Sequence, residues 1–587
     1  MTASAALTFQ LNGLVFVCYC RGARRSRFTM QGTARFLQPE RFLWPILILG
    51  ASLFLLLRCP TAAAGQNPSG YTGNEGCAKC HAAIYASYMR TPMAESSGAA
   101  GENLIAGEFT HKPSGVHYSI YRDGDKVWLS FERPGDSLLH GKREFLYYIG
   151  QGRRGRTYLF SVDGFVFESP VNWYADRHMW DMAPAYGDAK EAPLNLPATT
   201  SCLHCHVSGV RAPLDGSENH YPSPIFYYSG ITCERCHGPG AAHANGGAIV
   251  NPAKLPAKLR DQVCMQCHLE GNAAIERAGT HIYEFKPGDD LSRYVRYFVL
   301  SGNVPPGLRA TSQFESLAES VCKKKSGNVM SCTSCHDPHQ SVAPENRVVF
   351  YRAKCIACHG EAFAAKHHSK QQDCASCHMP ASLSSDVAHT EVTDHRILRN
   401  PSSKPSSDAP PTALPDLVPF PASDEARKDL RDLALAWQSM VNSGMTMAEP
   451  KAEQLLRAAL QNAPKDPALL SALGYIAQER GDFDRARSLY KRALEQDADL
   501  VDASTNLGVL EAQLGNTAEA IKLWQSAFER APGRSGIGMN LSRTFCAASQ
   551  FAAARDAVVR VLQFNPDLTP AKHLLAELNA SPPGCGL

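Results

Sequence analysis

Cysteine and histidine recur in this chain in one fixed arrangement. Seven strings read Cys-x-x-Cys-His, and we number them motifs 1 to 7 in chain order. Their cysteines are Cys77, Cys80, Cys202, Cys205, Cys233, Cys236, Cys264, Cys267, Cys332, Cys335, Cys355, Cys358, Cys374 and Cys377, and their histidines are His81, His206, His237, His268, His336, His359 and His378. Two thiols three positions apart can add to the two vinyl groups of one haem, and the adjacent imidazole then reaches the iron. The spacing therefore predicts seven covalently bound haem c groups, each with a proximal histidine.

Other uses of paired cysteines fit this pattern less well. The residue frequencies predict roughly 0.02 such strings by chance, against the seven observed. Zinc sites also use Cys-x-x-Cys pairs, but they take four ligands from two paired knuckles, whereas here every pair has its own histidine and the number of pairs is odd. A thioredoxin-like dithiol would occur once, near a β-α-β pattern. Haem attachment is the favoured interpretation.

The sixth ligand of each iron must come from elsewhere in the chain. Surplus histidines lie where a local turn could carry them to an iron, and a methionine close to motif 1 could bind through sulfur. These distal candidates are His243, His339, His367, His368, His389, His395 and Met93. For each of them the alternative is an ordinary packing or surface role.

Length and composition exclude several classes of protein. The 587 residues are enough for about four domains. The 59 basic and 56 acidic residues give a net charge of +3, too balanced for a dedicated nucleic-acid binder or an acidic disordered chain. With 44% hydrophobic residues and a mean hydropathy of −0.25, the chain also does not fit a polytopic membrane protein.

The first 64 residues predict export. Residues 42–57 form an apolar stretch of 16 residues that follows Arg35 and Arg41, and three alanines precede Gly65. This is typical of a cleaved secretory signal, with an N-terminal anchor in the inner membrane as the alternative. Thioether attachment takes place outside the reducing cytosol, so we expect a periplasmic or otherwise extracytoplasmic protein.

Residues 65–400 are predicted to form a heptahaem cytochrome domain. Two hairpins are expected in a small β insertion at about 108–170, one joining 117–121 to 127–131 and one joining 158–160 to 165–167, because Asp-Gly pairs separate the strands. Elsewhere we expect short helices and loops, because haem groups supply much of the apolar core.

The C-terminal part has a different character. Residues 401–423 are rich in proline and predict a semi-rigid linker. Residues 424–587 carry a period of 34, with Ala452, Ala486, Ala520 and Ala554 equally spaced, which resembles tetratricopeptide repeats. The predicted fold class is mainly α: a haem-wrapped domain with a β-hairpin insertion, followed by an α-α solenoid. Such a solenoid is either a stable array without a partner or a docking surface for another protein, and we favour docking.

Several strings resemble a known family. Residues 233–240 with His243, and residues 332–339, are similar to the tetrahaem cytochrome c-554 family and to larger multihaem cytochromes related to it. Residues 109–114, 150–159, 374–380 and 393–397 resemble bacterial multihaem proteins that carry C-terminal tetratricopeptide repeats. The resemblance covers about residues 71–580. It implies His243, His339 and His395 as distal ligands, with His111 as a further candidate. Relatives tend to carry Asn-His where this chain has Arg153 and Arg154, so the chain departs from the family pattern at these two positions.

These observations predict an electron carrier that relays electrons between redox partner proteins, with the repeats docking a protein partner and with no nucleic-acid partner. The alternative is a multihaem oxidoreductase that acts on a small nitrogen or sulfur compound at one open haem. No Cys-x-x-Cys-Lys string is present, which counts against that alternative. A third possibility is a redox sensor or a scaffold, but the sequence contains no module that would supply its output. We also expect Arg153, Arg154 and Arg156 to pair with haem propionates.

Overall fold

The computed structural model describes residues 7–11, 14–18, 69–183, 186–214, 216–301, 312–367, 373–383, 391–400 and 414–585. The chain forms two compact units, Met1–Ala64 and Gly65–Leu587. In the first unit β1 (Leu7–Leu11) pairs antiparallel with β2 (Leu14–Cys18). The apolar stretch predicted as a signal or anchor, 42–57, lies outside the described residues. Within the described ranges, no helix is both long and apolar enough to cross a membrane.

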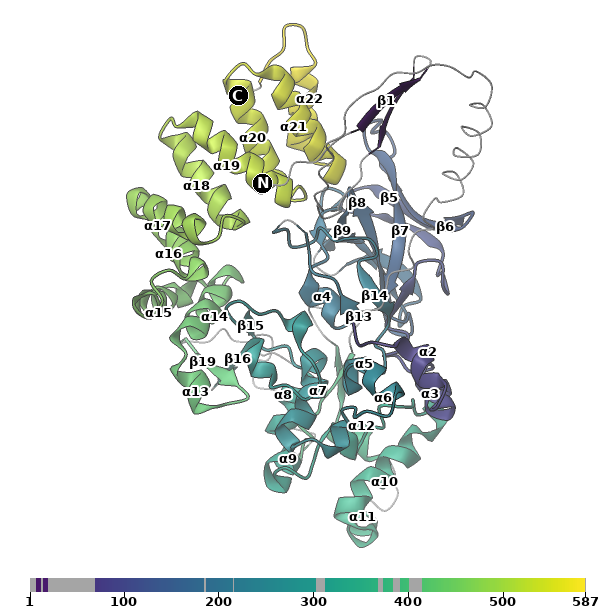
Figure 1. Cartoon of the computed structure of the whole chain (residues 1–587). Coiled ribbons are helices and arrows are strands. Elements are labelled where there is room, and N and C mark those ends of the chain that lie inside the picture. The colour runs from purple at the N-terminus through teal and green to yellow at the C-terminus, as the bar shows by residue number, and fades with distance from the viewer. Residues whose placement is uncertain are drawn as a thin grey trace, which may run out of the picture. The chain divides into compact units, whose positions relative to one another are not determined.

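The second unit begins with haem-motif helices and then a large antiparallel sheet (Figure 1). The main path of the sheet runs in the order β11-β10-β8-β7-β6-β5-β4, and β3, β9 and β12 pair off this path. The strands are β3 (Ser97–Ala99), β4 (Gly107–His111), β5 (Val116–Asp123), β6 (Lys126–Glu132), β7 (His140–Ile149), β8 (Gly155–Val162), β9 (Phe165–Glu168), β10 (Val171–Tyr174), β11 (Met179–Met182) and β12 (Leu196–Pro197).

Both predicted hairpins are confirmed. In the first, β5 pairs with β6 and Asp123 lies opposite Lys126 across a two-residue loop. In the second, β8 pairs with β9, and the loop residues Asp163 and Gly164 have φ of 51° and 85°. Positive φ at both positions is the requirement of a type I′ turn, which Asp-Gly meets at low cost. The Asp-Gly pairs therefore predicted these two hairpins correctly.

The sheet is larger than the predicted insertion at about 108–170. It starts at β3 and ends at β12, so it extends beyond that range on both sides. The hairpin of β10 and β11 turns through Asp176 and Arg177 without a glycine between the strands, and so gives no strong turn signal. The fold is consequently helical with a substantial sheet, rather than mainly helical with two hairpins.

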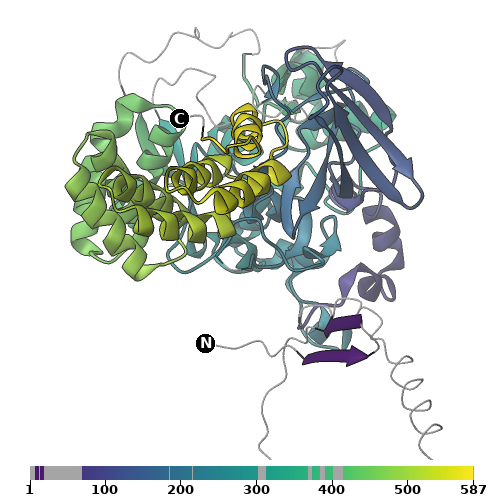
Figure 2. The ribbon, with the colours of Figure 1, turned by 90° about the horizontal axis from the view of Figure 1, so that it is seen from above.

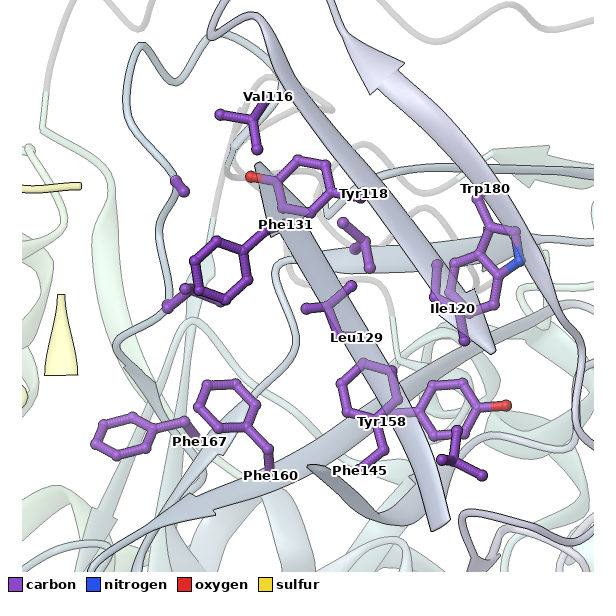
Figure 3. Packing of buried hydrophobic residues seen from close by; sticks show 14 of the residues in the cluster. Val116, Tyr118, Ile120, Leu129, Phe131, Phe145, Tyr158, Phe160, Phe167 and Trp180 are labelled. Carbon is purple, nitrogen blue, oxygen red and sulfur yellow. The ribbon is translucent and has the colours of Figure 1, made fainter. Parts of the chain in front are cut away.

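One face of this sheet forms a core of aromatic and branched side chains (Figure 3). Burial alternates along β5 and β6, so that every second residue points inward. Tyr118, Leu129 and Phe131 are at most 2% exposed, and the ring of Phe145 lies parallel to that of Tyr158 at 4.6 Å. Protein side chains fill this core.

The motif-bearing region consists of short elements, as the sequence predicted. Its helices are α2 (Gly73–Ala78), α3 (Ala82–Tyr88), α4 (Thr200–His204), α5 (Glu234–His237), α6 (Ala241–Ala244), α7 (Ala257–His268), α8 (Gln313–Glu319), α9 (Val321–Ser326), α10 (Arg347–His359), α11 (Glu361–His367) and α12 (Cys374–His378). Small antiparallel sheets join β13 (Val207–Val210) to β14 (Phe226–Ser229), and β17 (Ala381–Leu383) to β18 (Glu391–Thr393).

Part of the predicted linker is a strand. Residues Asp416–Phe420 form β19, which pairs antiparallel with β16 (Val295–Ser301); β16 in turn pairs with β15 (Ala273–Glu276). Pro419 is tolerated because β19 is the edge strand of this sheet. Leu417 and Phe298 are buried there. The predicted boundary at 423 is therefore wrong for residues 416–420, while 401–413 lie outside the described residues.

The C-terminal residues form stacked helix pairs, drawn green to yellow in Figure 2. The helices are α13 (Asp424–Lys428), α14 (Leu430–Asn442), α15 (Glu449–Asn462), α16 (Pro467–Glu479), α17 (Phe483–Gln496), α18 (Val501–Gln513), α19 (Thr517–Arg530), α20 (Ser535–Ala547), α21 (Phe551–Phe564) and α22 (Thr569–Leu578). The four equally spaced alanines are all buried. A Cβ on Gly474 would lie 2.7 Å from the Tyr490 ring, so the small residue permits the close approach within the α16/α17 pair.

Both ends of this solenoid contact the rest of the unit. At the C-terminal end, Phe564 belongs to the core of the large sheet, and the fully buried carboxylate of Asp567 pairs with Arg133 and Lys572. At the N-terminal end, Arg277 and Arg296 of the β15/β16 region pair with Asp429. The repeats are thus packed into the same unit as the motifs.

Candidate functional site

Each Cys-x-x-Cys-His motif lies in a helix or in the turn at a helix end. Motifs 4, 6 and 7 lie within α7, α10 and α12, whereas motifs 1 and 2 run past the ends of α2 and α4, and motif 5 begins with a 3₁₀ turn at Cys332–Ser334. In motif 1 the backbone N–H of His81 donates to the carbonyl of Cys77 at 3.0 Å, and motifs 3 and 5 repeat this bond at 3.0 and 2.9 Å. A helical turn brings residues three and four apart to the same side. None of the fourteen motif cysteines is in a disulfide, and the one disulfide among the described residues joins Cys546 to Cys585. Both thiols and the imidazole of each motif can therefore face one bound group.

Four of the seven motif histidines have a second imidazole opposite them. Metal-bound imidazole nitrogens lie about 2.0 Å from the metal, so two imidazoles on opposite sides of one ion have ring centres roughly 6 Å apart. The observed separations are 6.3 Å for His81 and His243, 6.0 Å for His237 and His339, 6.3 Å for His336 and His395, and 5.7 Å for His378 and His367. These spacings fit one iron between each pair.

Hydrogen bonds orient several of these rings. The Nδ1–H groups donate to backbone carbonyls, which leaves Nε2 for a metal. The bonds are His237 to Val250 at 2.9 Å, His243 to Gly247 at 3.1 Å, His378 to Leu398 at 2.6 Å and His395 to Thr393 at 2.6 Å. Metal-ligating histidines use this second bond to fix ring orientation and tautomer.

Burial keeps motif imidazoles neutral, the form that binds a metal. It is the first cause that lowers the pKa of His237, His268 and His336. Burial likewise raises the pKa of the thiols, to about 11 for Cys236 and Cys355. Thiols in this state are uncharged and poorly nucleophilic, so haem attachment fits a step that precedes final packing.

The other predicted distal ligands are not seen opposite a motif histidine in the described residues. His111 is 5% exposed, its Nδ1 bonds to Ser114 at 2.8 Å and its Nε2 to the carbonyl of Gly187 at 2.9 Å. Both ring nitrogens are engaged within the sheet region, so the geometry contradicts the expectation that His111 binds iron. Met93 is half-buried in the turn after α3. His368 and His389 lie outside the described residues.

His367 had weaker sequence support than its neighbour His368, yet it is the residue the fold brings to motif 7. It ends α11, and its ring also packs against Phe363 at 5.2 Å. The signal that could have found it is helical spacing: Phe363 and His367 are four residues apart and so share one face of α11.

The motifs lie against one another in a definite order. Thiols of different motifs lie close enough to shift one another's pKa. Such thiol pairs relate motif 1 to motif 3 (Cys77 and Cys233), motif 2 to motif 4 (Cys205 and Cys267), motif 4 to motif 5 (Cys264 and Cys332) and motif 6 to motif 7 (Cys355 and Cys374). Cys236 of motif 3 is close enough to Cys267 to raise its own pKa, and Cys335 and Cys358 relate motifs 5 and 6 in the same way. The contacts form a continuous series 1-3-4-5-6-7, with motif 2 meeting motif 4.

The expected propionate-binding arginines do not include Arg156. This side chain is 3% exposed, and its guanidinium donates to the carbonyls of Gly150, Asn103 and Gln151 while it stacks over Tyr148. It therefore has a structural role in the loop before β8.

Family models match three segments of the chain. The doubled CXXCH motif matches residues 325–364, cytochrome c554 and c-prime matches 172–238, and the tetratricopeptide repeat matches 471–535. These segments lie in the motif region, the sheet with motifs 2 and 3, and the solenoid.

Two curated relatives extend these matches. The chain is 26% identical over 224 residues to the multiheme cytochrome MtrA of Shewanella baltica, covering 32% of this chain and 63% of that protein. It is 24% identical over 403 residues to the dissimilatory sulfite reductase MccA of Wolinella succinogenes, covering 54% and 52%. The chain thus spans less than two thirds of the length of both relatives.

The chain is also similar to solved structures. MamA from Desulfovibrio magneticus RS-1 is 18% identical and covers 27% of this chain and 85% of its own, with a TM-score of 0.23. A TM-score this low carries no argument about the chain as a whole.

Proposed function

We propose that this chain, a multihaem c-type cytochrome with tetratricopeptide repeats, is an exported heptahaem electron relay. The observation that carries the proposal is the set of four imidazole pairs at the spacing of two ligands on one iron. With both axial positions filled, such an iron can exchange electrons but has no open position for a substrate. Each haem supplies one-electron iron chemistry when bound.

The ligand pairs follow from the geometry. We assign His243 opposite His81, His339 opposite His237, and His395 opposite His336. His367, rather than His368, is assigned opposite His378. The Nδ1 bonds of His237, His243, His378 and His395 to backbone carbonyls hold these imidazoles in orientation.

The contacts between motifs support an order for the relay. We propose the series 1-3-4-5-6-7, with a branch to motif 2 at motif 4, because these motifs approach through their thiols. Sequence order alone would place motif 2 between motifs 1 and 3. The relay would thus have three ends, at motifs 1, 2 and 7.

Export is supported by the disulfide between Cys546 and Cys585, which ties the C-terminal tail to α20. Disulfides persist in oxidising compartments and are rare in the cytosol. Together with the apolar stretch at 42–57, this favours a periplasmic or other extracytoplasmic location.

The repeats supply a surface for a protein partner. Tyr475, Phe483 and Leu514 are between 39% and 55% exposed on the solenoid. Isolated exposed apolar residues are common, but repeat arrays use such positions for binding. We therefore propose that the solenoid docks a redox partner while both of its ends stay packed against the rest of the unit.

The test is electron paramagnetic resonance of the oxidised protein, quantified against total haem by pyridine haemochrome. Seven haems per chain with only low-spin ferric signals would support the relay. A stoichiometric high-spin signal that changes on adding nitrite or sulfite would instead favour the oxidoreductase alternative.

A matched pair of variants tests the ligand assignment. His243→Ala should convert one low-spin haem to high-spin, whereas His117→Ala, which removes a histidine bonded to Thr110 in the sheet, should leave the spectrum unchanged. An unchanged spectrum for His243→Ala would contradict the pairing of His81 with His243.

A further inference from the structure

A single arginine lies where three haem motifs meet. Arg235 is the residue before the second cysteine of motif 3. Its Nη2 lies 2.5 and 2.7 Å from the ring nitrogens of His204 in motif 2, and it donates to the carbonyl of His204 at 3.2 Å. It also lies close enough to the thiol of Cys267 in motif 4 to lower the pKa of that thiol. The guanidinium thus contacts motif 2, lies near motif 4 and belongs to motif 3.

Motif 4 also contacts the backbone of Arg235. Gln266 of motif 4 is 3% exposed and donates from Nε2 to the backbone carbonyl of Arg235 at 3.3 Å. Glu234, although adjacent in sequence, does not serve as counter-charge, because its carboxylate accepts from the backbone N–H groups of Thr72, Gly73 and Gly240 at 2.7 to 2.9 Å.

No carboxylate neutralises Arg235 in the described part of the chain. Arg235 is half-buried, and its Nε has no hydrogen-bond partner there. Arg296, by contrast, pairs with Asp429, and the guanidinium of Arg156 donates to several carbonyls. A partly desolvated guanidinium without a carboxylate partner makes the local electrostatic potential more positive.

The guanidinium also borders a cavity of about 540 Å³. Four tyrosines line it, Tyr71, Tyr228, Tyr283 and Tyr294, together with Lys286. The hydroxyl of Tyr228 is buried without a partner, and that of Tyr294 donates to Asp289 at 2.7 Å. Glu234, Glu284 and Asp289 also line the cavity, so it presents charges of both signs and hydroxyl groups beside motifs 2 and 3.

We infer that Arg235 is a redox-tuning residue, a fixed positive charge shared by the haems of motifs 2, 3 and 4. This inference rests on the proposed relay function. A positive charge in a low-dielectric site stabilises the reduced iron, which carries one positive charge fewer, and so raises the midpoint potential. The charge sits at the branch point of the proposed series, where it makes motif 4 and its two neighbours easier to reduce.

The experiment is a spectropotentiometric titration of the full-length, haem-loaded protein. Arg235→Gln should shift the redox equilibria of three haems towards the oxidised state by about tenfold each, which is 59 mV for a one-electron couple. Arg235→Lys keeps the charge and should retain most of the wild-type potentials. Arg211→Gln is the control, because Arg211 also donates to backbone carbonyls near motif 2 but touches no motif residue.

Three outcomes would overturn the inference. These are unchanged potentials in Arg235→Gln, equal shifts in the Gln and Lys variants, and a shift confined to one haem. If Arg235→Gln fails to take up its haems, Tyr283→Glu places a carboxylate in the same cavity and should lower the same three potentials; no shift in this variant counts equally against the inference. Equilibrium potentials do not depend on electron transfer to a partner, so failure of the relay proposal would be seen separately.

Discussion

Two helices of equal length show how differently the motif region and the solenoid are built. Helix α16 of the solenoid and helix α10 of the motif region both have 13 residues. Helix α16 buries six of its side chains, including Leu469 and Leu473, whereas α10 buries none. In α10 and α11, Val349 and Phe363 are 70% and 51% exposed.

The difference lies in what supplies the apolar core. The solenoid and the large sheet bury their apolar surface against other side chains, which is enough to stabilise a domain. The helices that carry motifs 6 and 7 present apolar side chains next to cysteines that are spaced for haem. Haem groups bound at these motifs would cover such residues, so we expect this region to need its cofactors to complete a core.

The largest effect is expected from removing one haem tether. The double substitution Cys355→Ser, Cys358→Ser deletes both thiols of motif 6. We expect one haem fewer per chain and amide hydrogen exchange in α10–α12 at nearly the rate of unfolded backbone, while α16–α21 keep their protection. Hydrogen exchange with mass spectrometry measures both regions at once.

Cys322→Ser is the control for this pair, since Cys322 is a thiol close to motif 5 but outside any motif. If α10–α12 keep their hydrogen-exchange protection in the double variant, side chains alone are enough to stabilise these helices. The proposed difference between the motif region and the solenoid would then be wrong.

The next largest effect concerns the contact between the solenoid and the sheet. Asp567→Ala removes a carboxylate with 0% exposure that pairs with both Arg133 and Lys572, and leaves these two cations only Asp136 as a shared partner. Breaking a buried ion pair in this way costs about 3–5 kcal/mol. Urea unfolding of the full chain should show this loss, whereas Asp556→Ala, at an exposed position on α21, should change stability by less than about 0.5 kcal/mol.

A smaller effect tests the side-chain core of the solenoid itself. A Cβ on Gly508 would lie 2.5 Å from the indole of Trp524, so Gly508→Ala overpacks the α18/α19 pair and should cost about 1–3 kcal/mol. Gly536→Ala is matched to it, because a Cβ there meets nothing within 4 Å. If both substitutions lower the urea midpoint equally, close packing is not the reason for Gly508.

The smallest effect is a pH dependence. Arg487, together with Asn516 and Lys491, lowers the pKa of Glu511 to about 2, from about 4.3 in an unfolded chain. A depressed carboxyl pKa adds stability above the unfolded value, and this stability is lost as the pH falls through about 4 towards 2. We expect about 1–2 kcal/mol, discounted because the side chains of Arg487 and Lys491 are 35% and 44% exposed.

Urea midpoints of the wild type and of Glu511→Gln, measured from pH 6 down to pH 2.5, check this. The wild type should be more stable at pH 6, and the difference should shrink as the pH falls. A difference that does not vary with pH would assign the role of Glu511 to packing rather than charge.

Much of the molecule could be predicted because its signals are local. The motif spacing places two thiols and an imidazole on one helical turn, and the Asp163-Gly164 pair specifies a tight hairpin. The period of 34 predicts the helix pairs, since each repeat must present the same small residues to its neighbour.

The errors occurred where distant segments decide. Residues 416–420 lie in a proline-rich stretch and contain Pro419, yet they pair with β16 because an edge position tolerates that proline. His111 resembles a ligand in sequence, but Ser114 and the carbonyl of Gly187, a residue far along the chain, occupy its nitrogens.

The sequence by itself determined the chemistry of the chain: which residues can tether a haem, how many motifs there are, and that a helical repeat follows them. Only the tertiary structure decided which imidazole lies opposite which, that motif 3 rather than motif 2 adjoins motif 1, and that Arg235 lies among three motifs. The physical reason is range. Covalent attachment needs groups a few residues apart, whereas axial pairing, motif order and the field at an iron depend on contacts between segments up to about a hundred and sixty residues apart, as Thr72 and Glu234 are.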